Sequence, residues 1–235
     1  MIVCAIIQAR LSSKRFPGKV LADLNGRPIL AHVIERARKI EGVDHVVVAM
    51  PEDDYPAIPN ALLPFAGGYS YGMGPRDDVL ARFHLVAKIL NPDVIVRLTA
   101  DNPLLDPQLS SLVLRWYMAN REHIDYVSNA YPPSFPDGLD TEVFSRRALD
   151  LAHRHAATAY DREHVTAWMR NNLAISTVQH REDYSHLRWT VDRPADLEHV
   201  RAVHAATFPE MNWEHVVRMY YPDVVKHEVL SVMST

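Results

Sequence analysis

The sequence contains little cysteine, no long hydrophobic run and no excess of positive charge. Cys4 is the only cysteine, which excludes an internal disulfide and a zinc site built from cysteines. No apolar run approaches the roughly 18 residues that a membrane span requires. A net charge of -4, with 13 histidines counted as neutral, argues against a nucleic-acid-binding protein. We therefore expect a protein that neither binds nucleic acid nor inserts into a membrane.

The overall composition is that of a soluble protein with a full core. Hydrophobic residues make up 48% and charged residues 23% of the chain, and 235 residues are enough for one large domain. We expect a single domain over residues 1–235. The first apolar run has no charged leader, and Gln8 and Arg10 follow it too soon for a signal peptide. A cytoplasmic location is therefore expected.

General phosphate-binding and hydrolase motifs are absent or out of context. No G-x-x-x-x-G-K-[ST] occurs, and Gly72-Met-Gly74-Pro-Arg-Asp77 breaks G-x-G-x-x-G at its third glycine. Gly68-Tyr-Ser-Tyr-Gly72 matches the nucleophile elbow G-x-S-x-G. Its flank carries a proline and no helix begins at the second glycine, so we do not expect Ser70 to be a nucleophile.

The first half of the chain alternates between strands and helices. Apolar runs predict strands, and helical spacing of apolar residues predicts the segments between them. This rhythm is typical of a three-layer α/β/α sandwich with a mostly parallel sheet, and Cys4 would be buried in its first strand. A segment rich in proline and glycine, 51–76, is expected to be a long loop. The strands are expected at Ile2–Ile7, Val43–Met50, Val94–Thr99 and near Tyr126–Val127, and the helices at about 28–40, 77–90 and 107–121.

The rhythm changes after Asn129, and a small β-rich insertion is expected at about 129–186. A turn-rich loop comes first, and short strands and helices follow it. The expected strands are Glu142–Phe144, Ile175–Gln179 and Leu187–Val191, and the expected helices are Ser145–His155, Tyr160–Asn171, Ala195–Thr207 and Trp213–Tyr220.

A basic loop follows the first strand directly. Ligands in open α/β sheets bind beyond the carboxyl ends of strands, and arginine forks and lysine ammonium groups bind phosphate oxygens there. The loop is therefore predicted to bind a triphosphate. The alternative is a solvated basic loop with no ligand. The cations of the loop are Arg10, Lys14, Arg15 and Lys19.

Two aspartates, Asp101 and Asp192, each follow an expected strand. Both would lie at the same edge of the sheet as Arg10, where a pair of carboxylates can hold Mg²⁺ together with phosphate oxygens and waters. The alternative is that each aspartate only caps a turn before the proline two residues further on. Their combination with the basic loop favours the metal.

The cluster Arg162-Glu163-His164 lies near the expected start of a helix, where an anionic acceptor could bind. His164 is a candidate base only if it faces the pocket. The cluster could equally be a charged patch on the surface.

Several segments together resemble the CMP-sugar synthetases, which are the acylneuraminate and 3-deoxy-manno-octulosonate cytidylyltransferases. The match is closer to their spore-coat-polysaccharide relatives, and it covers roughly residues 2–207 in the family's order. The segments are Gln8-Ala-Arg10, Arg15-Phe-Pro-Gly-Lys19, Asn25-Gly-Arg-Pro28, Asp77-Asp-Val-Leu-Ala-Arg82, Arg97-Leu-Thr-Ala-Asp-Asn-Pro103, Asp125-Tyr-Val-Ser-Asn129, Gly138-Leu-Asp-Thr-Glu-Val-Phe144, Arg162-Glu-His-Val-Thr166 and Thr190-Val-Asp-Arg-Pro-Ala-Asp-Leu197.

The resemblance implies a GT-A-like nucleotidyltransferase fold, CTP as donor, Mg²⁺ and a homodimer. Carried over by motif, the catalytic residues would be Arg10, Lys19, Asp101 and Asp192, of which Asp101 and Asp192 would hold the metal. The nucleotide would contact Ala9, Arg10, Leu11, Arg15, Lys19, Asp78, Arg82, Thr99 and Ala100. The acceptor would lie near Asn129, Glu142, Arg162 and His164.

The expected activity is transfer of CMP from CTP to a small acidic acceptor, a sugar acid or a phosphorylated acid, with release of pyrophosphate. Surface polysaccharide or glycoconjugate biosynthesis is the expected context. One alternative is a glycosyltransferase, although the third strand ends in Asp101-Asn-Pro103 and lacks the usual Asp-x-Asp motif. A second alternative is a non-catalytic nucleotide-binding module.

Overall fold

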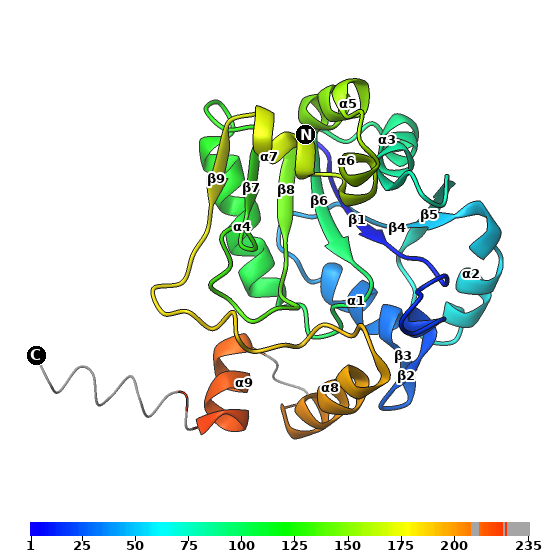
Figure 1. The fold of residues 1–235 in the computed structure, drawn as a ribbon, viewed down its shortest axis with the longest axis vertical. Helices are drawn as coiled ribbons and strands as arrows, with labels where there is room; N and C mark the ends of the chain where they lie inside the picture. Colours follow the sequence, from blue (N-terminus) through cyan, green and yellow to red (C-terminus); the bar gives the residue numbers. More distant parts are fainter. Residues whose placement is uncertain (208–211, 223, 225–235) are drawn as a thin grey trace, which may run out of the picture.

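A computed structural model describes residues 1–207, 212–222 and 224, and it is organised around one mixed sheet (Figure 1). The strand order is β5-β4-β1-β6-β8-β7-β9, and β2 and β3 form a separate hairpin. The strands are β1 (Val3–Gln8), β2 (Asp23–Leu24), β3 (Arg27–Pro28), β4 (His45–Pro51), β5 (Ser70–Gly74), β6 (Val94–Thr99), β7 (Tyr126–Ser128), β8 (Glu142–Ser145) and β9 (Ile175–Thr177).

The sheet is mostly parallel, as the alternation of strands and helices predicts. β1 pairs in parallel with β4 and β6, β4 with β5, and β7 with β9. Only β8 runs the other way among the sheet strands that the structure describes, since it is antiparallel to β6 and to β7. The segment 129–186, expected to be an insertion, thus supplies β8 and β9 to the main sheet.

Helices cover both faces of the sheet, which confirms the three-layer sandwich. Alternate residues of β1 point to opposite faces: Ala5 and Ile7 pack with α1 and α4, whereas Cys4 and Ile6 pack with α3 and α5. Cys4 is fully buried, as expected. The helices are α1 (Ile29–Ala37), α2 (Ala57–Leu62), α3 (Val79–Leu90), α4 (Pro107–Asn120), α5 (Arg146–His155), α6 (Ala159–His164), α7 (Ala167–Asn172), α8 (Pro194–Thr207) and α9 (Trp213–Tyr220), with 3-10 turns η1 (Lys19–Leu21) and η2 (Glu52–Asp54).

A third apolar cluster lies beyond one end of the sheet, where α8 and α9 pack together (Figure 1). Trp189, Leu197 and Trp213 are buried in it. Among the residues described, no helix has the length and apolar character of a membrane span. Of the carboxyl-terminal segment that the sequence leaves unassigned, 223 and 225–235 lie outside the described residues.

The long loop expected at 51–76 is wrong, because the segment contains η2, α2 and β5. β5 extends the parallel sheet beyond β4. A Cβ on Gly72 would lie 2.4 Å from Val86 Cγ2, so this glycine lets the edge strand pack closely against α3. The two glycines of β5, Gly72 and Gly74, thus allow close packing on α3 and do not mark a loop.

Two further expectations on secondary structure are wrong. The helix expected at Tyr160–Asn171 is divided into α6 and α7 at Val165, which adopts φ 57° and ψ -58°. Arg162 and His164 therefore lie at the end of a helix and not at its start. The segment 187–191 forms no strand with the residues that the structure describes, because its only ladder contact with them is a single bridge between Asp137 and Arg188.

Candidate active site

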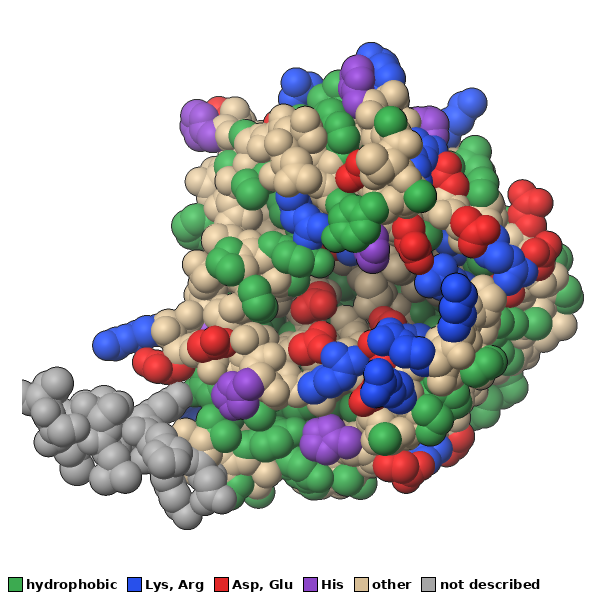
Figure 2. Space-filling view, in the orientation of Figure 1, with side chains coloured by type: hydrophobic (Ala, Val, Ile, Leu, Met, Phe, Trp, Pro, Cys, Tyr) green, Lys and Arg blue, Asp and Glu red, His purple; other side chains and the backbone are tan. Residues whose placement is uncertain are grey.

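An open cleft of about 740 Å³ lies at the carboxyl ends of β1 and β6. Figure 2 shows Lys and Arg side chains gathered beside a hollow near the middle of the molecule, with acidic side chains among them. This is the sheet edge at which open α/β folds bind their ligands. The lining residues are Gln8, Ala9, Arg10, Ser12, Ser13, Lys14, Arg15, Lys19, Val20, Arg76, Asp77, Val79, Arg82, Thr99, Ala100, Asp101, Glu163, His164 and Asp192.

The basic loop after β1 is folded back on itself by backbone hydrogen bonds. Leu11 N donates to the carboxylate of Asp54 at 2.8 Å, and Gly18 N donates to Leu11 O at 2.8 Å. Gly18 has φ +71°, a left-handed conformation that favours glycine, and η1 begins directly after it. The turn directs Lys19 inward, where only 8% of its surface is exposed.

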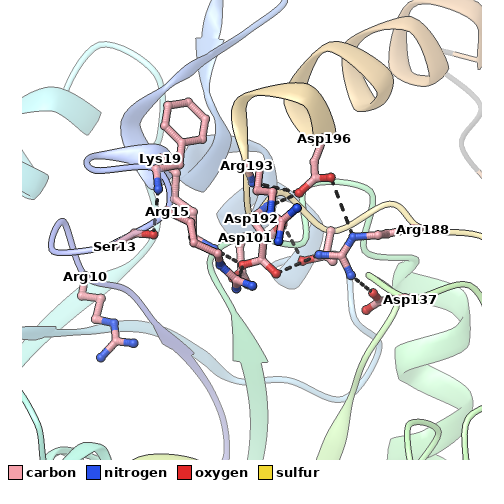
Figure 3. A network of polar contacts seen from close by, with 12 residues as sticks. Arg10, Ser13, Arg15, Lys19, Asp101, Asp137, Arg188, Asp192, Arg193 and Asp196 are labelled. Atoms are coloured by element: carbon pink, nitrogen blue, oxygen red, sulfur yellow. Dashed lines mark hydrogen bonds and ion pairs between the residues drawn. The ribbon is translucent and has the colours of Figure 1, made fainter.

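Lys19 lies between the two aspartates that follow the expected strands. Its ammonium nitrogen is 2.7 Å from Asp101 Oδ2 and 2.9 Å from Asp192 Oδ1 (Figure 3). Arg15 Nη2 is 2.8 Å from the same Asp192 oxygen. Burial works to raise the pKa of Asp192, but hydrogen bonds from Lys19 and Arg188 and the charge of Arg15 outweigh it, so the pKa lies below its usual value. Asp192 is therefore ionised at neutral pH.

The two carboxylates fit a divalent cation. One oxygen of Asp101 and one of Asp192 approach the same nitrogen of Lys19, so they converge on a single positive charge. Their side chains are 26% and 20% exposed, which leaves the pair open to the cleft. In the described part of the chain no three His, Cys, Asp or Glu residues form a metal site. Two carboxylates completed by phosphate oxygens and waters are a common arrangement for Mg²⁺.

Arg10 and Arg82 also line the cleft. Arg10 Nη2 is 3.2 Å from Glu163 Oε1, and Figure 3 shows Arg10 apart from the aspartates. Arg82 is 1% exposed and donates to the carbonyls of Ala9 and Arg76 at 3.3 Å, and its Nε has no partner among the described residues. Burial and then the charge of Arg10 lower the pKa of Arg82 to about 10. Arg82 therefore stays charged at neutral pH.

Most of the residues that the family resemblance assigns to the nucleotide line the cleft. Leu11 and Asp78 do not. Leu11 contributes its backbone to the fold of the basic loop. Asp78 accepts from Ala81 N at 2.8 Å as the cap of α3 and pairs with Arg162 at 2.5 Å. The predicted nucleotide residues in the lining are Ala9, Arg10, Arg15, Lys19, Arg82, Thr99 and Ala100.

Of the residues assigned to the acceptor, His164 lines the cleft, whereas Asn129, Glu142 and Arg162 do not. Asn129 is 2% exposed and holds the loop before β8, because it accepts from Thr141 N at 2.7 Å. Arg162 ties α6 to Asp78. Burial lowers the pKa of His164, the charge of Glu163 works against this, and the charges of nearby arginines lower the pKa further, so its imidazole is neutral at pH 7.

Glu142 lies at the centre of a buried polar network. Its carboxylate accepts hydrogen bonds from Tyr126 Oη at 2.6 Å and Thr166 Oγ1 at 2.5 Å, and it pairs with Arg97. Arg97 also donates to Gln8 Oε1 at 3.0 Å and 3.2 Å, and Gln8 lines the cleft. Glu142 therefore supports one wall of the cleft from behind.

The sequence motifs do not predict the role of Arg188, which bridges Asp137 Oδ2 at 2.5 Å and Asp192 Oδ2 at 2.8 Å. The only local pattern that points to Arg188 is its spacing: Arg188, Asp192 and Asp196 are each four positions apart. Asp137 comes from a loop more than fifty positions earlier, so no local pattern could reveal that contact.

Comparison with known proteins identifies the family of this chain. The sequence profile of a family described as Cytidylyltransferase matches residues 4–215. The chain belongs to this family. The spore coat polysaccharide biosynthesis protein SpsF of Bacillus subtilis (strain 168) is 32% identical to this chain over 209 residues, which cover 85% of each chain. The resemblance read from the motifs is confirmed.

Two other proteins are similar to this cytidylyltransferase-family chain. The 3-deoxy-manno-octulosonate cytidylyltransferase of Anaeromyxobacter sp. (strain Fw109-5) is 41% identical over 115 residues, which cover 48% of this chain and 46% of the relative. The solved structure of a cytidylyltransferase from Leptospira borgpetersenii serovar Hardjo-bovis has a TM-score of 0.86 at 26% identity, and the match covers 100% of this chain and 98% of that one. The fold expected from the sequence is confirmed.

Proposed function

We propose that the protein transfers CMP from CTP to a small acidic acceptor, a sugar acid or a phosphorylated acid, and releases pyrophosphate. The observation that carries the proposal is the position of Lys19 between Asp101 and Asp192 in a cleft lined by further cations. Cations and paired carboxylates at one point suit a polyphosphate bound with its metal ion. Membership of the cytidylyltransferase family supports cytidine as the base.

In the proposed site, Arg10, Arg15 and Lys19 bind the triphosphate, and Asp101 and Asp192 hold Mg²⁺. When bound, Mg²⁺ supplies positive charge to the phosphoryl oxygens. The remaining nucleotide contacts follow the order of the motifs. They are proposed for Ala9, Leu11, Asp78, Arg82, Thr99 and Ala100, of which Leu11 and Asp78 would act through the loop and helix that they hold.

The reaction is a displacement at the α-phosphorus of CTP. An acceptor hydroxyl oxygen forms a bond to that phosphorus as the bond to the bridging oxygen of the β-phosphate breaks, and pyrophosphate carries away the electron pair. Neutral His164 lines the cleft and can accept the proton of the hydroxyl. Catalysis then rests on positioning and on positive charge from Lys19 and Arg10.

His164 is the proposed direct contact of the acceptor. Asn129, Glu142 and Arg162 would shape the acceptor side from behind the cleft wall, because their side chains bond to neighbouring protein groups. The chain would work as a single nucleotidyltransferase domain, as a homodimer and in the cytoplasm. The relative SpsF, named for spore coat polysaccharide biosynthesis, supports a role in surface polysaccharide or glycoconjugate biosynthesis.

A pyrophosphate-release screen tests the proposal. Each of the four nucleoside triphosphates is incubated with Mg²⁺ and a panel of sugar acids and phosphorylated acids. We expect pyrophosphate with CTP and one class of acceptor. Release of a nucleoside diphosphate from a nucleotide-sugar would indicate glycosyl transfer, and tight CTP binding without turnover would indicate a binding module. Either result would refute the proposal.

Lys19→Ala should lower turnover by about 10² or more, by analogy with the loss of one preorganised donor to a developing charge. Lys39→Ala is a matched control, because Lys39 pairs with Glu35 at 3.0 Å on the surface and its side chain is 63% exposed. The control should keep wild-type turnover. Normal pyrophosphate release by a folded Lys19→Ala variant would rule out the proposed role of the lysine.

A further inference from the structure

The two carboxylate oxygens of Asp192 have different partners. Oδ1 accepts from Lys19 Nζ at 2.9 Å and pairs with Arg15 Nη2 at 2.8 Å. Oδ2 accepts from Arg188 Nη2 at 2.8 Å (Figure 3). Rotation of the carboxylate about its side-chain torsion would break the bond to Arg188. One oxygen is therefore kept toward Lys19 and Asp101, where the proposed cation would bind.

Arg188 is itself held on its other side. Its Nη1 is 2.5 Å from Asp137 Oδ2, and its Nε is 3.8 Å from Asp196 Oδ1. A planar guanidinium that bonds carboxylates along two edges has little freedom to turn. Figure 3 shows Arg188 between these carboxylates, on the side of Asp192 away from Arg10.

The backbone fixes the carboxylates that hold Arg188. Asp137 N donates to Leu187 O at 2.9 Å, and Trp189 N donates to Asp137 O at 2.6 Å. Gly138 follows with φ +116°, and a Cβ there would lie 2.7 Å from Thr190 N, so the loop packs directly on the segment that carries Arg188. Asp137 and Arg188 thus belong to one rigid unit.

The carboxylate of Asp196, the third one near Arg188, is also held by the backbone. Asp196 Oδ2 accepts from the backbone nitrogens of Asp192 and Arg193, each at 2.8 Å, at the start of α8. The carboxylate of Asp192 therefore sits in a frame whose parts come from the loop before β8, the segment before α8 and α8 itself.

We propose that Arg188 is a positioning residue that sets the side-chain torsion of Asp192, and that it thereby increases the affinity of Asp101 and Asp192 for a divalent cation. This inference rests on the proposed role of the two aspartates as metal ligands. Residues that orient a metal ligand commonly contribute about 10–100-fold to metal affinity.

The charge of Arg188 acts in the opposite direction. A positive charge beside the aspartates repels a cation, so removal of the side chain would combine a loss of orientation with a gain in attraction. Arg188→Lys separates the two effects. Lysine keeps the charge, but a single ammonium cannot replace the planar fork that reaches Asp137 and Asp192 together.

The test is direct binding of Mn²⁺ to the whole protein, with free Mn²⁺ measured by electron paramagnetic resonance, alone and with CTP present. We expect Arg188→Lys to bind Mn²⁺ about 10-fold more weakly than wild type. Arg115→Lys is the matched control, since Arg115 pairs with Glu41 at 3.0 Å and both side chains are more than half exposed. The control should bind Mn²⁺ as wild type does. Thermal unfolding establishes that each variant is folded.

The outcomes separate this inference from the proposed function. Wild-type Mn²⁺ affinity in Arg188→Lys, with a clear loss in Asp192→Asn, would refute the positioning role and leave the metal site intact. Wild-type affinity in both Asp101→Asn and Asp192→Asn would refute the metal site and this inference with it. If Arg188→Lys does not fold, Asp137→Asn loosens Arg188 from its far side and should weaken Mn²⁺ binding in the same direction. Unchanged binding there would overturn the inference.

Discussion

Replacement of Glu142 by glutamine should destabilise the protein, because its carboxylate is a buried acceptor for three donors. Glu142 is 2% exposed and bonds to Tyr126, Thr166 and Arg97. Glutamine has one carbonyl oxygen and an amide group that donates, so it cannot accept from all three partners. It also leaves Arg97 without its counter-charge.

The size of the loss follows from the burial of Arg97. Its side chain is 12% exposed, and burial lowers the pKa of its guanidinium, which means that the charged form has lost hydration. Removal of one partner from a buried ion pair costs about 3–5 kcal/mol. Because Arg97 keeps its two hydrogen bonds to Gln8, we expect the lower end, about 3 kcal/mol. For a chain of this length this is a decrease of about 6–12 °C in Tm.

The assay is urea unfolding followed by circular dichroism at pH 7, with a companion variant that carries Arg97→Met, Glu142→Met, Tyr126→Phe and Thr166→Val together. Replacing all members of a buried polar network by apolar side chains can be nearly neutral, so the companion variant should lose much less than Glu142→Gln. The comparison measures the cost of an unpaired charge and not the loss of packing.

The Glu142→Gln variant also distinguishes the buried position of Glu142 from the direct acceptor contact that the family resemblance implies, if its KM for the acceptor is measured beside its stability. A loss in the free energy of unfolding below about 1 kcal/mol, together with a strongly raised KM for the acceptor, would refute the reasoning from the buried network.

Gly138→Ala should lower the free energy of unfolding by about 2–4 kcal/mol, because a Cβ there would lie 2.7 Å from backbone atoms at φ +116°. Gly26→Ala, at φ +87° with nothing within 4 Å, should lose about 1 kcal/mol, and urea unfolding compares the two. Burial and then the charge of Asp137 raise the pKa of Asp140 from 3.8 to about 7. The free energy of unfolding of the wild type should therefore fall as pH rises between these two values. Asp140→Asn should lose less stability over this range, as denaturant titrations at about pH 4 and 8 would measure. The pKa of Asp192 lies below 3.8, so its stabilising contribution is present above that pH and disappears as pH falls through the folded-state pKa. Asp192→Asn should therefore be less stable than wild type at pH 7, and the difference should shrink as pH falls through the folded-state pKa of Asp192; a constant difference would contradict this account.

The sequence predicts the elements that local patterns determine. β6 begins and ends at Val94 and Thr99 as expected, and α3 begins where Asp78 can cap it. The run 187–191 shows why such patterns can mislead. Trp189 and Val191 are buried, but they pack in the third apolar cluster without joining a sheet. Apolar periodicity reports burial, and strand pairing depends on neighbours from elsewhere in the chain.

The same distinction divides the candidate site. The sequence alone predicts that Arg10, Asp101 and Lys19 lie close together. Arg10 and Asp101 come directly after parallel strands, and Lys19 ends the loop that follows the first of these strands. The environment of Glu142 could not be predicted in this way, because its partners Arg97, Tyr126 and Thr166 come from β6, β7 and the start of α7. A sequence shows which residues can carry charge, and it does not show which charges are already neutralised inside the fold.

The position of β8 has a consequence for the order in which the chain can assemble. β7 pairs only with β8 and β9, and β8 lies between β6 and β7 in the described sheet. Until residues 142–145 have left the ribosome, β6 is an edge strand with free backbone donors and acceptors, open to pairing with another chain. β8 thus joins the two halves of the sheet, and a nascent chain that stalls before residue 142 would expose the edge of β6 to its neighbours.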